Sequence, residues 1–179
     1  MRIVAGQWRG RPLVTPKGDT TRPTADRTRE TLFSMLTSRI GSFEGLRVAD
    51  LFAGSGALGL EALSRGAAHC LFVEQDAAAL HALRANVAKL GASADIRAQS
   101  VMALGAAPKA YDLILMDPPY GTGAGGAALD RLARLGWAGP ASWISIETGR
   151  DEVLKTAGFT IETVRDSGRA RLHLLRPEQ

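Results

Sequence analysis

The sequence predicts an α/β fold in which one doubly wound, mostly parallel sheet of seven strands occupies a single domain. Three observations lead to this prediction. Segments with strand and helix periodicity alternate through most of the chain. A glycine-rich turn joins the first strand of the alternating region to the following helix. The length of 179 residues is about that of one domain, so a second domain is not expected.

The part of the chain before the alternating region is basic and irregular. Residues 2–14 show a strand-like alternation of side chains on either side of Gln7-Trp8-Arg9-Gly10. This pattern predicts a short β-hairpin arm whose basic side chains share one face. Pro16, Gly18 and Pro23 indicate a loop that completes an arm segment of residues 1–23. Thr24 is placed to cap a helix that ends at Gly41, with apolar residues at helical spacing at Leu32, Phe33, Leu36 and Ile40.

Strands and helices then alternate as expected for parallel strands joined by right-handed crossovers. Strand patterns occupy residues 46–52, 70–74, 95–98, 111–116 and 143–147. Helical patterns occupy residues 57–65, 77–90 and 129–135. The last two strands, 159–164 and 170–175, are separated by a short turn with a glycine, which predicts an antiparallel C-terminal hairpin at the sheet edge.

The net charge of +4 lies at one end of the chain. Residues 1–30 carry seven Lys or Arg and three acidic residues, a difference of +4, and the remaining residues sum to zero. A localised positive charge favours a polyanionic partner, most often a nucleic acid. The chain has no apolar run long enough for a membrane span, no leader-like start and one cysteine, Cys70, so we expect a cytoplasmic protein without membrane contact.

A glycine-rich loop follows the first strand of the Rossmann-like region. Gly54, Gly56 and Gly59 satisfy the spacing that permits a tight turn and close approach of a ligand to the backbone. Glu74 ends the next strand, where a carboxylate can accept hydrogen bonds from ribose hydroxyls. Asp50 would repel a pyrophosphate and suits an ammonium group, which favours S-adenosylmethionine over a nicotinamide dinucleotide. Asp50 could also cap the loop backbone, which is compatible with the same ligand.

The segment Asp117-Pro118-Pro119-Tyr120 directly follows an apolar strand. The two prolines remove two backbone donors, so the turn presents mainly hydrogen-bond acceptors. An exocyclic amino group on a nucleobase needs such acceptors, and Tyr120 offers an aromatic face for stacking the base. These four residues are therefore the candidate catalytic group.

Two other features are given no role in chemistry. A second glycine run over residues 121–126 follows a Pro-Pro turn and has no acidic residue to hold a ribose, so we expect a flexible loop. His69, His81 and His173 are scattered and, with Cys70, match no ligand spacing, so no metal site is expected.

Together these motifs resemble those of class I S-adenosylmethionine-dependent methyltransferases, and the Asp-Pro-Pro-Tyr form resembles that used on amino nitrogens. Over nearly the whole chain, residues 2–11, 22–33 and 50–66 resemble the RsmD family. The resemblance implies methylation of the exocyclic N2 amine of a guanine in bacterial 16S ribosomal RNA. It also implies a monomer that acts on this RNA, either free or in a partly assembled 30S subunit.

The resemblance assigns roles to individual residues. S-adenosylmethionine would contact a set of cofactor residues: Thr24, Asp50, Ala53, Gly54, Ser55, Gly56, Glu74, Gln75, Ser100, Val101 and Met102. Guanine would face the catalytic turn. RNA phosphates would contact a set of arginines: Arg2, Arg9, Arg11, Arg22, Arg27 and Arg29. The glycine run after Tyr120 lacks the basic and bulky residues expected there, so RNA contacts from it are not expected.

Alternatives remain at this stage. A DNA adenine-N6 methyltransferase shares a related turn but usually needs an added recognition domain. A protein glutamine-N5 methyltransferase typically has Asn at the position of Asp117. An NAD-dependent oxidoreductase conflicts with Asp50 and with the acceptor-rich turn. An RNA-binding module without activity conflicts with the intact motif residues.

Overall fold

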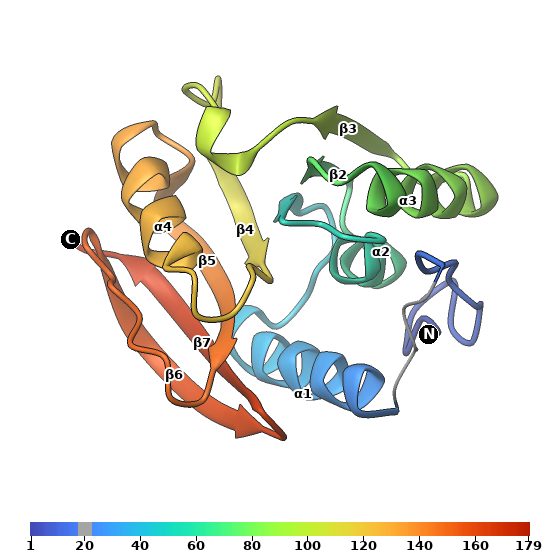
Figure 1. Ribbon diagram of the computed structural model, residues 1–179, viewed down its shortest axis with the longest axis horizontal. Coiled ribbons are helices and arrows are strands. Elements are labelled where there is room, and N and C mark those ends of the chain that lie inside the picture. The colour runs from blue at the N-terminus through green and yellow to red at the C-terminus, as the bar shows by residue number, and fades with distance from the viewer. Residues whose placement is uncertain (18–22) are drawn as a thin grey trace.

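A computed structural model describes residues 1–17 and 23–179 of the protein, with only the backbone described at residues 23 and 24. Seven strands form one sheet in the order β3-β2-β1-β4-β5-β7-β6 (Figure 1). Five of them pair in parallel: β1 Arg47–Leu51, β2 His69–Glu74, β3 Ala94–Ala98, β4 Tyr111–Met116 and β5 Ala138–Gly149. Strand β7 Ala170–Pro177 pairs antiparallel with both β5 and β6 Phe159–Ser167. The predicted fold class is confirmed.

Helices cover both faces of the sheet (Figure 1). Helices α1 Pro23–Ile40, α2 Ala57–Ser64 and α3 Ala77–Leu90 pack on one face. Helix α4 Ala124–Arg134 and the short 3-10 helix η1 Val101–Ala103 pack on the other. A sheet covered on both faces needs apolar residues on both sides of its strands, and this is why the central strands are almost continuously apolar.

The two faces have separate hydrophobic cores because successive side chains of a strand point to opposite sides. In β4, Leu113 and Leu115 pack under α1, α2 and α3, whereas Ile114 and Met116 pack under α4. All four side chains are at most 1% exposed. The carboxyl ends of these rigid central strands carry the candidate site.

Two elements extend beyond the predicted boundaries. Strand β5 begins at Ala138 rather than at residue 143, and its register against β4 shifts between Tyr111 and Leu113. The shift accommodates Pro140, which has no donor for a regular ladder. The C-terminal hairpin also continues further than predicted, so that only Gly168 and Arg169 separate its strands.

The glycine run after Tyr120 is not the flexible loop that the sequence suggested. Gly123, at φ 73°, precedes α4, and both Gly125 and Gly126 lie within this helix. A Cβ atom at Gly125 would lie 2.7 Å from Cδ1 of Ile146, closer than carbon atoms normally approach. The glycine therefore allows α4 to pack closely on β5.

The predicted N-terminal hairpin is present as an antiparallel chain reversal, but without regular strands in its described residues. The chain reverses direction within residues 1–17, but this described segment contains only one isolated antiparallel bridge, between Arg2 and Pro12, and no strand. Backbone hydrogen bonds from Ile3 N–H to the Arg11 carbonyl and from Leu13 N–H to the Met1 carbonyl join the two halves of the segment. Other backbone groups bond to α2, and Gly6 lies so close to the Ser64 carbonyl that a side chain at Gly6 would clash. Helix α1 begins at Pro23, so Thr24 lies inside the helix rather than at its cap.

Among the helices of the described part of the chain, none combines the length and apolar character that a membrane span requires.

Candidate active site

The glycine-rich loop between β1 and α2 has an unusual backbone. Phe52, which is not a glycine, adopts φ 59°, and Gly54 and Gly56 follow at φ 57° and φ 90°. A positive φ is unfavourable for a bulky residue, and such conformations concentrate at functional sites. A Cβ atom at Gly56 would lie 2.5 Å from Cδ1 of Leu83, so this position also needs glycine for packing.

Glu74 at the end of β2 holds the loop in place. One carboxylate oxygen accepts a hydrogen bond from the Gly54 backbone N–H at 2.8 Å. The other accepts hydrogen bonds from the N–H groups of Gln75 and Asp76, both at 2.8 Å. A carboxylate has about four lone-pair sites, so Glu74 keeps acceptor capacity for a ligand while it orders the loop.

Asp50 lies behind the loop rather than in contact with a ligand site. Its side chain is 1% exposed, and Oδ2 accepts a hydrogen bond from the Gly59 N–H at 2.9 Å. Burial raises the pKa of Asp50 to about 8; the Gly59 bond opposes this rise and the charge of Glu74 adds to it. Of the two sequence-based interpretations, the structure supports the backbone cap and contradicts the direct ammonium ligand.

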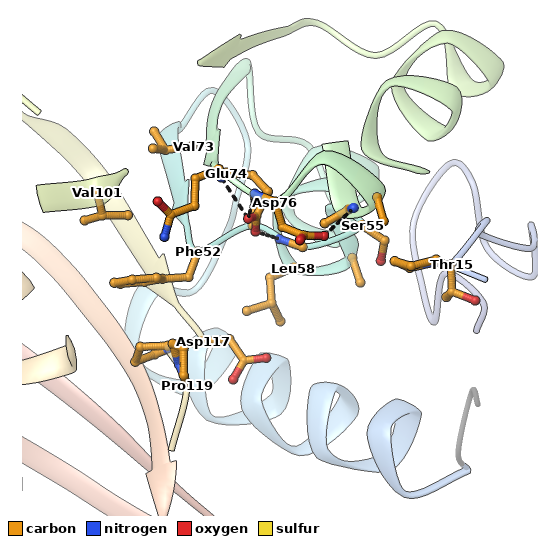
Figure 2. A pocket seen from close by; sticks show the side chains of 18 of the residues that line it. Thr15, Phe52, Ser55, Leu58, Val73, Glu74, Asp76, Val101, Asp117 and Pro119 are labelled. Atoms are coloured by element: carbon orange, nitrogen blue, oxygen red, sulfur yellow. Dashed lines mark hydrogen bonds between the residues drawn. The ribbon is translucent and has the colours of Figure 1, made fainter. Parts of the chain in front are cut away.

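The loop borders a cavity of about 1070 Å³ at the carboxyl ends of β1, β2 and β4 (Figure 2). In Figure 2, Asp117 and Pro119 lie opposite Phe52 and Leu58. The volume is large enough for a nucleoside-bearing cofactor. The predicted residues that line this cavity are Ala53, Gly54, Ser55, Glu74, Gln75, Val101, Asp117, Pro118, Pro119 and Tyr120.

Other predicted cofactor residues do not border the cavity. Gly56 packs behind the loop. Ser100 accepts a hydrogen bond from the Met102 N–H at 3.1 Å and so caps η1. Met102 is 41% exposed on the other side of η1 and does not line the cavity. The side chain of Thr24 lies outside the described residues. Of the four residues predicted for the adenine pocket, Gln75 and Val101 line the cavity, and Ser100 and Met102 do not.

The candidate catalytic turn, Asp117–Tyr120, is held by β5. Met116 pairs in register with Ile146, which places Asp117 and Glu147 side by side at the ends of neighbouring parallel strands. The Tyr120 hydroxyl donates a hydrogen bond to Oε2 of Glu147, and the Tyr120 ring lies over Gly149. Tyr120 as a whole is nevertheless 46% exposed, so a base can reach it for stacking.

Asp117 occupies an electrostatically unfavourable position for a carboxylate. Its side chain lines both cavities, and the surrounding protein partly shields it from solvent. This desolvation, followed by the neighbouring Glu147 carboxylate, raises the pKa of Asp117 well above its usual range. Desolvation and the bond to Glu147 likewise raise the pKa of Tyr120. The site therefore holds two adjacent acids that favour a hydrogen-bond donor between them.

A second cavity of about 670 Å³ adjoins the first. It lies between α1, the start of α2 and the turn that joins β6 to β7. The two cavities share lining residues: Met1, Ala57, Leu58, Asp117, Tyr120 and Glu147. The Asp117–Tyr120 turn therefore lies at the junction of the two cavities.

Comparisons with known proteins agree with this geometry. The family described as "Conserved hypothetical protein 95" matches residues 1–176. Ribosomal RNA small subunit methyltransferase D of Escherichia coli K12 is 36% identical over 184 residues, which cover 99% of this chain and 90% of that protein. The chain belongs to the RsmD family. The protein of the same name from Haemophilus influenzae is 38% identical and covers 87% of this chain, with 82% of its own length matched.

Solved structures share the fold of this RsmD-family chain. The structure titled "Putative methyltransferase yhhF from Escherichia coli" superposes with a TM-score of 0.85 at 34% identity, covering 99% of this chain and 98% of that one. Magnesium protoporphyrin IX methyltransferase from Synechocystis, solved with bound SAM, has a TM-score of 0.71 at 16% identity, covering 90% of this chain and 87% of its own. At this low identity, the second likeness shows a shared fold.

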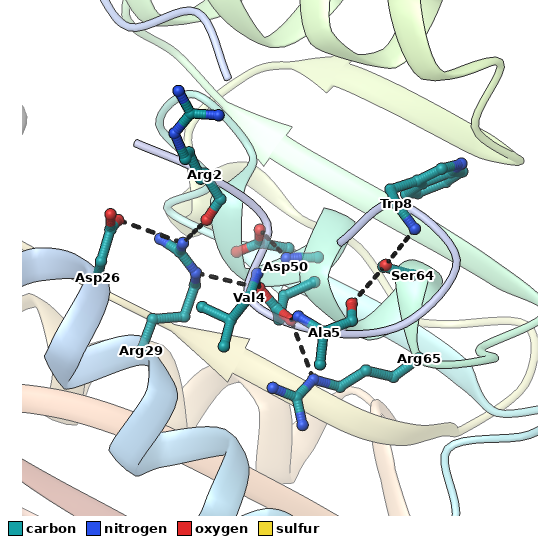
Figure 3. A network of polar contacts seen from close by, with 11 residues as sticks. Arg2, Val4, Ala5, Trp8, Asp26, Arg29, Asp50, Ser64 and Arg65 are labelled. Carbon is teal, nitrogen blue, oxygen red and sulfur yellow. Dashed lines mark hydrogen bonds and ion pairs between the residues drawn. The ribbon is translucent and has the colours of Figure 1, made fainter. Parts of the chain in front are cut away.

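The basic N-terminal segment of this RsmD-family chain is partly exposed and partly buried. Arg2, Arg9, Arg11 and Arg27 are exposed, as RNA contacts require, and Arg22 lies outside the described residues. Arg29 is 4% exposed and its guanidinium bonds to the Glu61 carboxylate, to Asp26 and to the Arg2 carbonyl (Figure 3). The prediction that Arg29 binds RNA phosphates is wrong, because its donors are used inside the protein.

Sequence reasoning missed several residues that line the RsmD-family cavities. Phe52 and Asp76 border the larger cavity, as does the segment 15–17 at the end of the arm, and Glu147 borders both. Glu147 could have been found, because it follows the apolar run Ile144-Ser145-Ile146 at the end of a predicted strand. Segment 15–17 carries no comparable signal, because only tertiary structure brings it to the cavity. No group of three or more potential metal ligands occurs among the described residues.

Proposed function

We propose that the protein transfers a methyl group from S-adenosylmethionine to the exocyclic N2 amine of a guanine in bacterial 16S ribosomal RNA. The observation that carries this proposal is the junction of two cavities at the Asp117–Tyr120 turn. Such a junction suits a methyl donor on one side and an acceptor base on the other. The names of the RsmD-family relatives support ribosomal RNA of the small subunit as the substrate.

The residues around the larger cavity fit S-adenosylmethionine. Glu74 would accept hydrogen bonds from the ribose hydroxyls, and Gln75 and Val101 would border the adenine. Ala53, Gly54 and Ser55 would lie along the methionine end. When bound, the cofactor supplies an electrophilic methyl group on a sulfonium centre. Asp50 contributes by ordering the loop rather than by contact.

The catalytic turn then orients the acceptor amine. Pro118 and Pro119 have no backbone N–H, so the turn offers the Pro118 carbonyl and Asp117 to the two N2–H donors. Tyr120 would stack on the guanine, a contact worth about 1–3 kcal/mol in comparable sites. Positioning and electrostatic complementarity therefore do most of the work. The amine gives up a proton in the reaction, and Asp117 or water receives it.

RNA binding would use the exposed arginines of the N-terminal segment. Arg2, Arg9, Arg11 and Arg27 lie on the surface, and these side chains can neutralise phosphates. The target guanine must leave its stack to reach the second cavity, which is easier in an RNA loop than in a duplex. We expect a cytoplasmic monomer that acts on 16S ribosomal RNA, free or within a partly assembled 30S subunit.

The decisive experiment uses labelled S-adenosylmethionine. Ribosomal RNA and 30S particles from a strain without this gene are incubated with the protein, and the nucleosides are then analysed. Label on N2-methylguanosine at one position supports the proposal. Label on adenine or on a protein would reassign the function to the adenine-N6 or glutamine-N5 class, and cofactor-dependent hydride transfer would favour an oxidoreductase.

A further inference from the structure

Glu147 lies at the junction of the two cavities, and the proposed mechanism gives it no role. It is next to Asp117 at the ends of two neighbouring parallel strands, because Ile146 and Met116 pair in register. Glu147 borders both cavities. Its position therefore allows it to contact the same acceptor base as Asp117.

The Glu147 carboxylate is already oriented by the protein. Oε2 accepts the hydrogen bond of the Tyr120 hydroxyl, and the Tyr120 ring is supported from below by Gly149, where a Cβ atom would lie 3.5 Å from Cδ2 of the ring. A carboxylate has about four lone-pair sites, so Glu147 can accept a further hydrogen bond without losing Tyr120. The side chain is a fixed acceptor beside a fixed stacking surface.

A pair of adjacent carboxylates selects the chemistry of its ligand. Two like charges repel one another, and Glu147 contributes in this way to the raised pKa of Asp117. A ligand that brings two neighbouring donors relieves the repulsion, whereas a ligand with a lone pair at either position adds to it. On the Watson–Crick edge, guanine carries neighbouring donors at N1 and N2, while adenine has an acceptor at N1.

We propose that Glu147 is a specificity residue for guanine: its carboxylate accepts the N1–H while Asp117 and the Pro118 carbonyl accept the N2–H groups. This inference rests on the proposed function and adds the reason why guanine is chosen over a base that offers only an amino group. A site built to bond a donor rejects an analogue without it, because the buried acceptor is left unpaired.

The test compares two RNAs whose acceptor bases differ at N1 and at position 6. A synthetic hairpin with the target guanosine is compared with one that carries 2-aminopurine riboside, which keeps the N2 amine but has an acceptor at N1 and no O6. The native protein should methylate the guanosine RNA with a kcat/KM about 10- to 100-fold higher, as expected for one hydrogen bond to a charged group. Equal rates on the two RNAs would overturn the inference.

The Glu147→Gln variant then assigns the preference to this residue. Its amide can donate to an N1 acceptor as well as accept from an N1–H, so the preference should shrink to within about threefold. The matched control is Glu162→Gln, the same change on the exposed face of β6, which should keep the preference of the native protein. A preference that survives in Glu147→Gln at its full size rejects the assignment.

The Tyr120→Phe variant tests whether Glu147 contacts the base directly or acts on it only through Tyr120. Removing the hydroxyl leaves both carboxylates in place, so the preference for guanosine should persist even if turnover falls. If Tyr120→Phe loses the preference as fully as Glu147→Gln does, the discrimination comes from the tyrosine and the inference fails.

Failure of this inference can be told apart from failure of the proposed function. If the native protein forms no N2-methylguanosine on either RNA or on 30S particles, the proposed function fails. If it forms N2-methylguanosine but accepts 2-aminopurine equally, only the role of Glu147 fails. Circular dichroism and cofactor affinity are measured for each variant, and should Glu147→Gln not fold, equal rates of the native protein on the two RNAs would still overturn the inference.

Discussion

Asp117 and Asp50 both have a raised pKa, but the two carboxyl groups lie in different surroundings. Asp117 faces the cavity beside Glu147, so ligands and solvent reach it. Asp50 is buried behind the glycine-rich loop, with Oδ1 free of any hydrogen-bond partner within the described structure. The first position suits contact with a substrate, and the second suits only the support of a backbone turn.

Replacing Asp117 by alanine should remove an acceptor for the amine without disturbing the cofactor loop. We expect kcat to fall by about 10²–10⁴, the usual contribution of a positioned acid–base group. S-adenosylmethionine affinity, measured by calorimetry, should stay within about threefold because Glu74 and the loop are unchanged. Turnover like that of the native protein would show that Asp117 is not part of the catalytic group.

The raised pKa of Asp117 predicts the acidic side of the pH profile. If the ionised carboxylate accepts the amine hydrogen bond, kcat/KM should fall as the pH drops through this raised pKa, at a pH above the ordinary carboxyl range. The negative charges near Asp117 are those of Glu147 and, further away, Asp50. Glu147→Gln removes the larger of these and should move the fall to lower pH. An acidic limb that stays in place in this variant contradicts the coupling.

The raised pKa of Asp50 predicts an effect on stability rather than on activity. The effect is a loss of stability as the pH rises, whereas the activity that depends on Asp117 is lost as the pH falls. The folded-state pKa of Asp50, about 8, lies above the ordinary value of 3.8, so the folded protein keeps a proton that the unfolded chain has released. The contribution of Asp50 to the free energy of unfolding therefore decreases as the pH rises from about 4 to about 8.

Asp50→Asn should remove that dependence, because the amide oxygen still accepts the Gly59 bond and carries no charge. Between pH 5 and pH 8, we expect the free energy of unfolding of the variant to rise by on the order of 4 kcal/mol relative to that of the native protein. Urea unfolding at the two pH values measures this gain. Asp130→Asn, on the exposed surface of α4, is the control, and a gain of the same size there would refute the explanation.

At the scale of elements, the N-terminal arm is bound to α2 by Ser64 and by a buried acid, Glu61. Glu61 is fully buried, and its carboxylate accepts hydrogen bonds from the Val4 and Ala5 N–H groups and pairs with Arg29 and Arg65. Truncation of this acid leaves two guanidinium groups and two backbone donors with fewer partners.

Glu61→Ala should therefore destabilise the protein by about 3–5 kcal/mol, the usual cost of breaking a buried ion pair by removing one partner. Denaturant unfolding measures the change, and Glu30→Ala on the exposed face of α1 serves as the control. Limited proteolysis should also cut the arm first in the Glu61 variant. A loss below about 1 kcal/mol would mean that the arm is held by other contacts.

Elements whose determinants are local could be predicted well from the sequence. The helix Ala77–Leu90 and the strand Tyr111–Met116 match their predicted bounds. The apolar pattern of each lies within the segment itself, and the capping residues of the helix directly flank it. The arm could not be predicted in detail, because Glu61 and Ser64, which bond its backbone, lie more than fifty residues away in the chain. The burial of Arg29 has the same origin.

The candidate site shows the same division between local and distant determinants. Glu74 and the Asp117–Tyr120 turn could be found by their motifs and positions at strand ends. The pairing of Glu147 with Tyr120, and the place of Asp50 behind the loop, depend on the register of neighbouring strands and on packing. Sequence motifs therefore located the site, and tertiary structure decided which side chains face its ligands.

At the scale of the whole molecule, exposed positive charge and the cavities lie near each other. Arg9 and Arg11 are exposed on the arm, and segment 15–17 at its end lines the larger cavity. Replacing both arginines by alanine should weaken RNA binding and reduce the slope of log affinity against log salt by about 1.5–2. Filter binding at several salt concentrations measures this slope.

The control is the double replacement of Lys109 and Arg134 by alanine, which removes the same charge from exposed positions away from the arm. It should leave the slope close to that of the native protein. If the arm variant and the control change the slope equally, net charge rather than the arm attracts the RNA.

Asn86 on α3 joins the arm to the cofactor loop. Its side-chain amide accepts a hydrogen bond from the Val14 N–H at 2.7 Å and donates to the carbonyls of Val14 and Ser55, both at 2.9 Å. A single side chain thus serves a segment of the arm that carries exposed arginines and a segment beside the larger cavity. Energetic coupling between two sites is reciprocal, so any factor by which an ordered arm tightens the cofactor loop is also the factor by which an occupied loop tightens the arm.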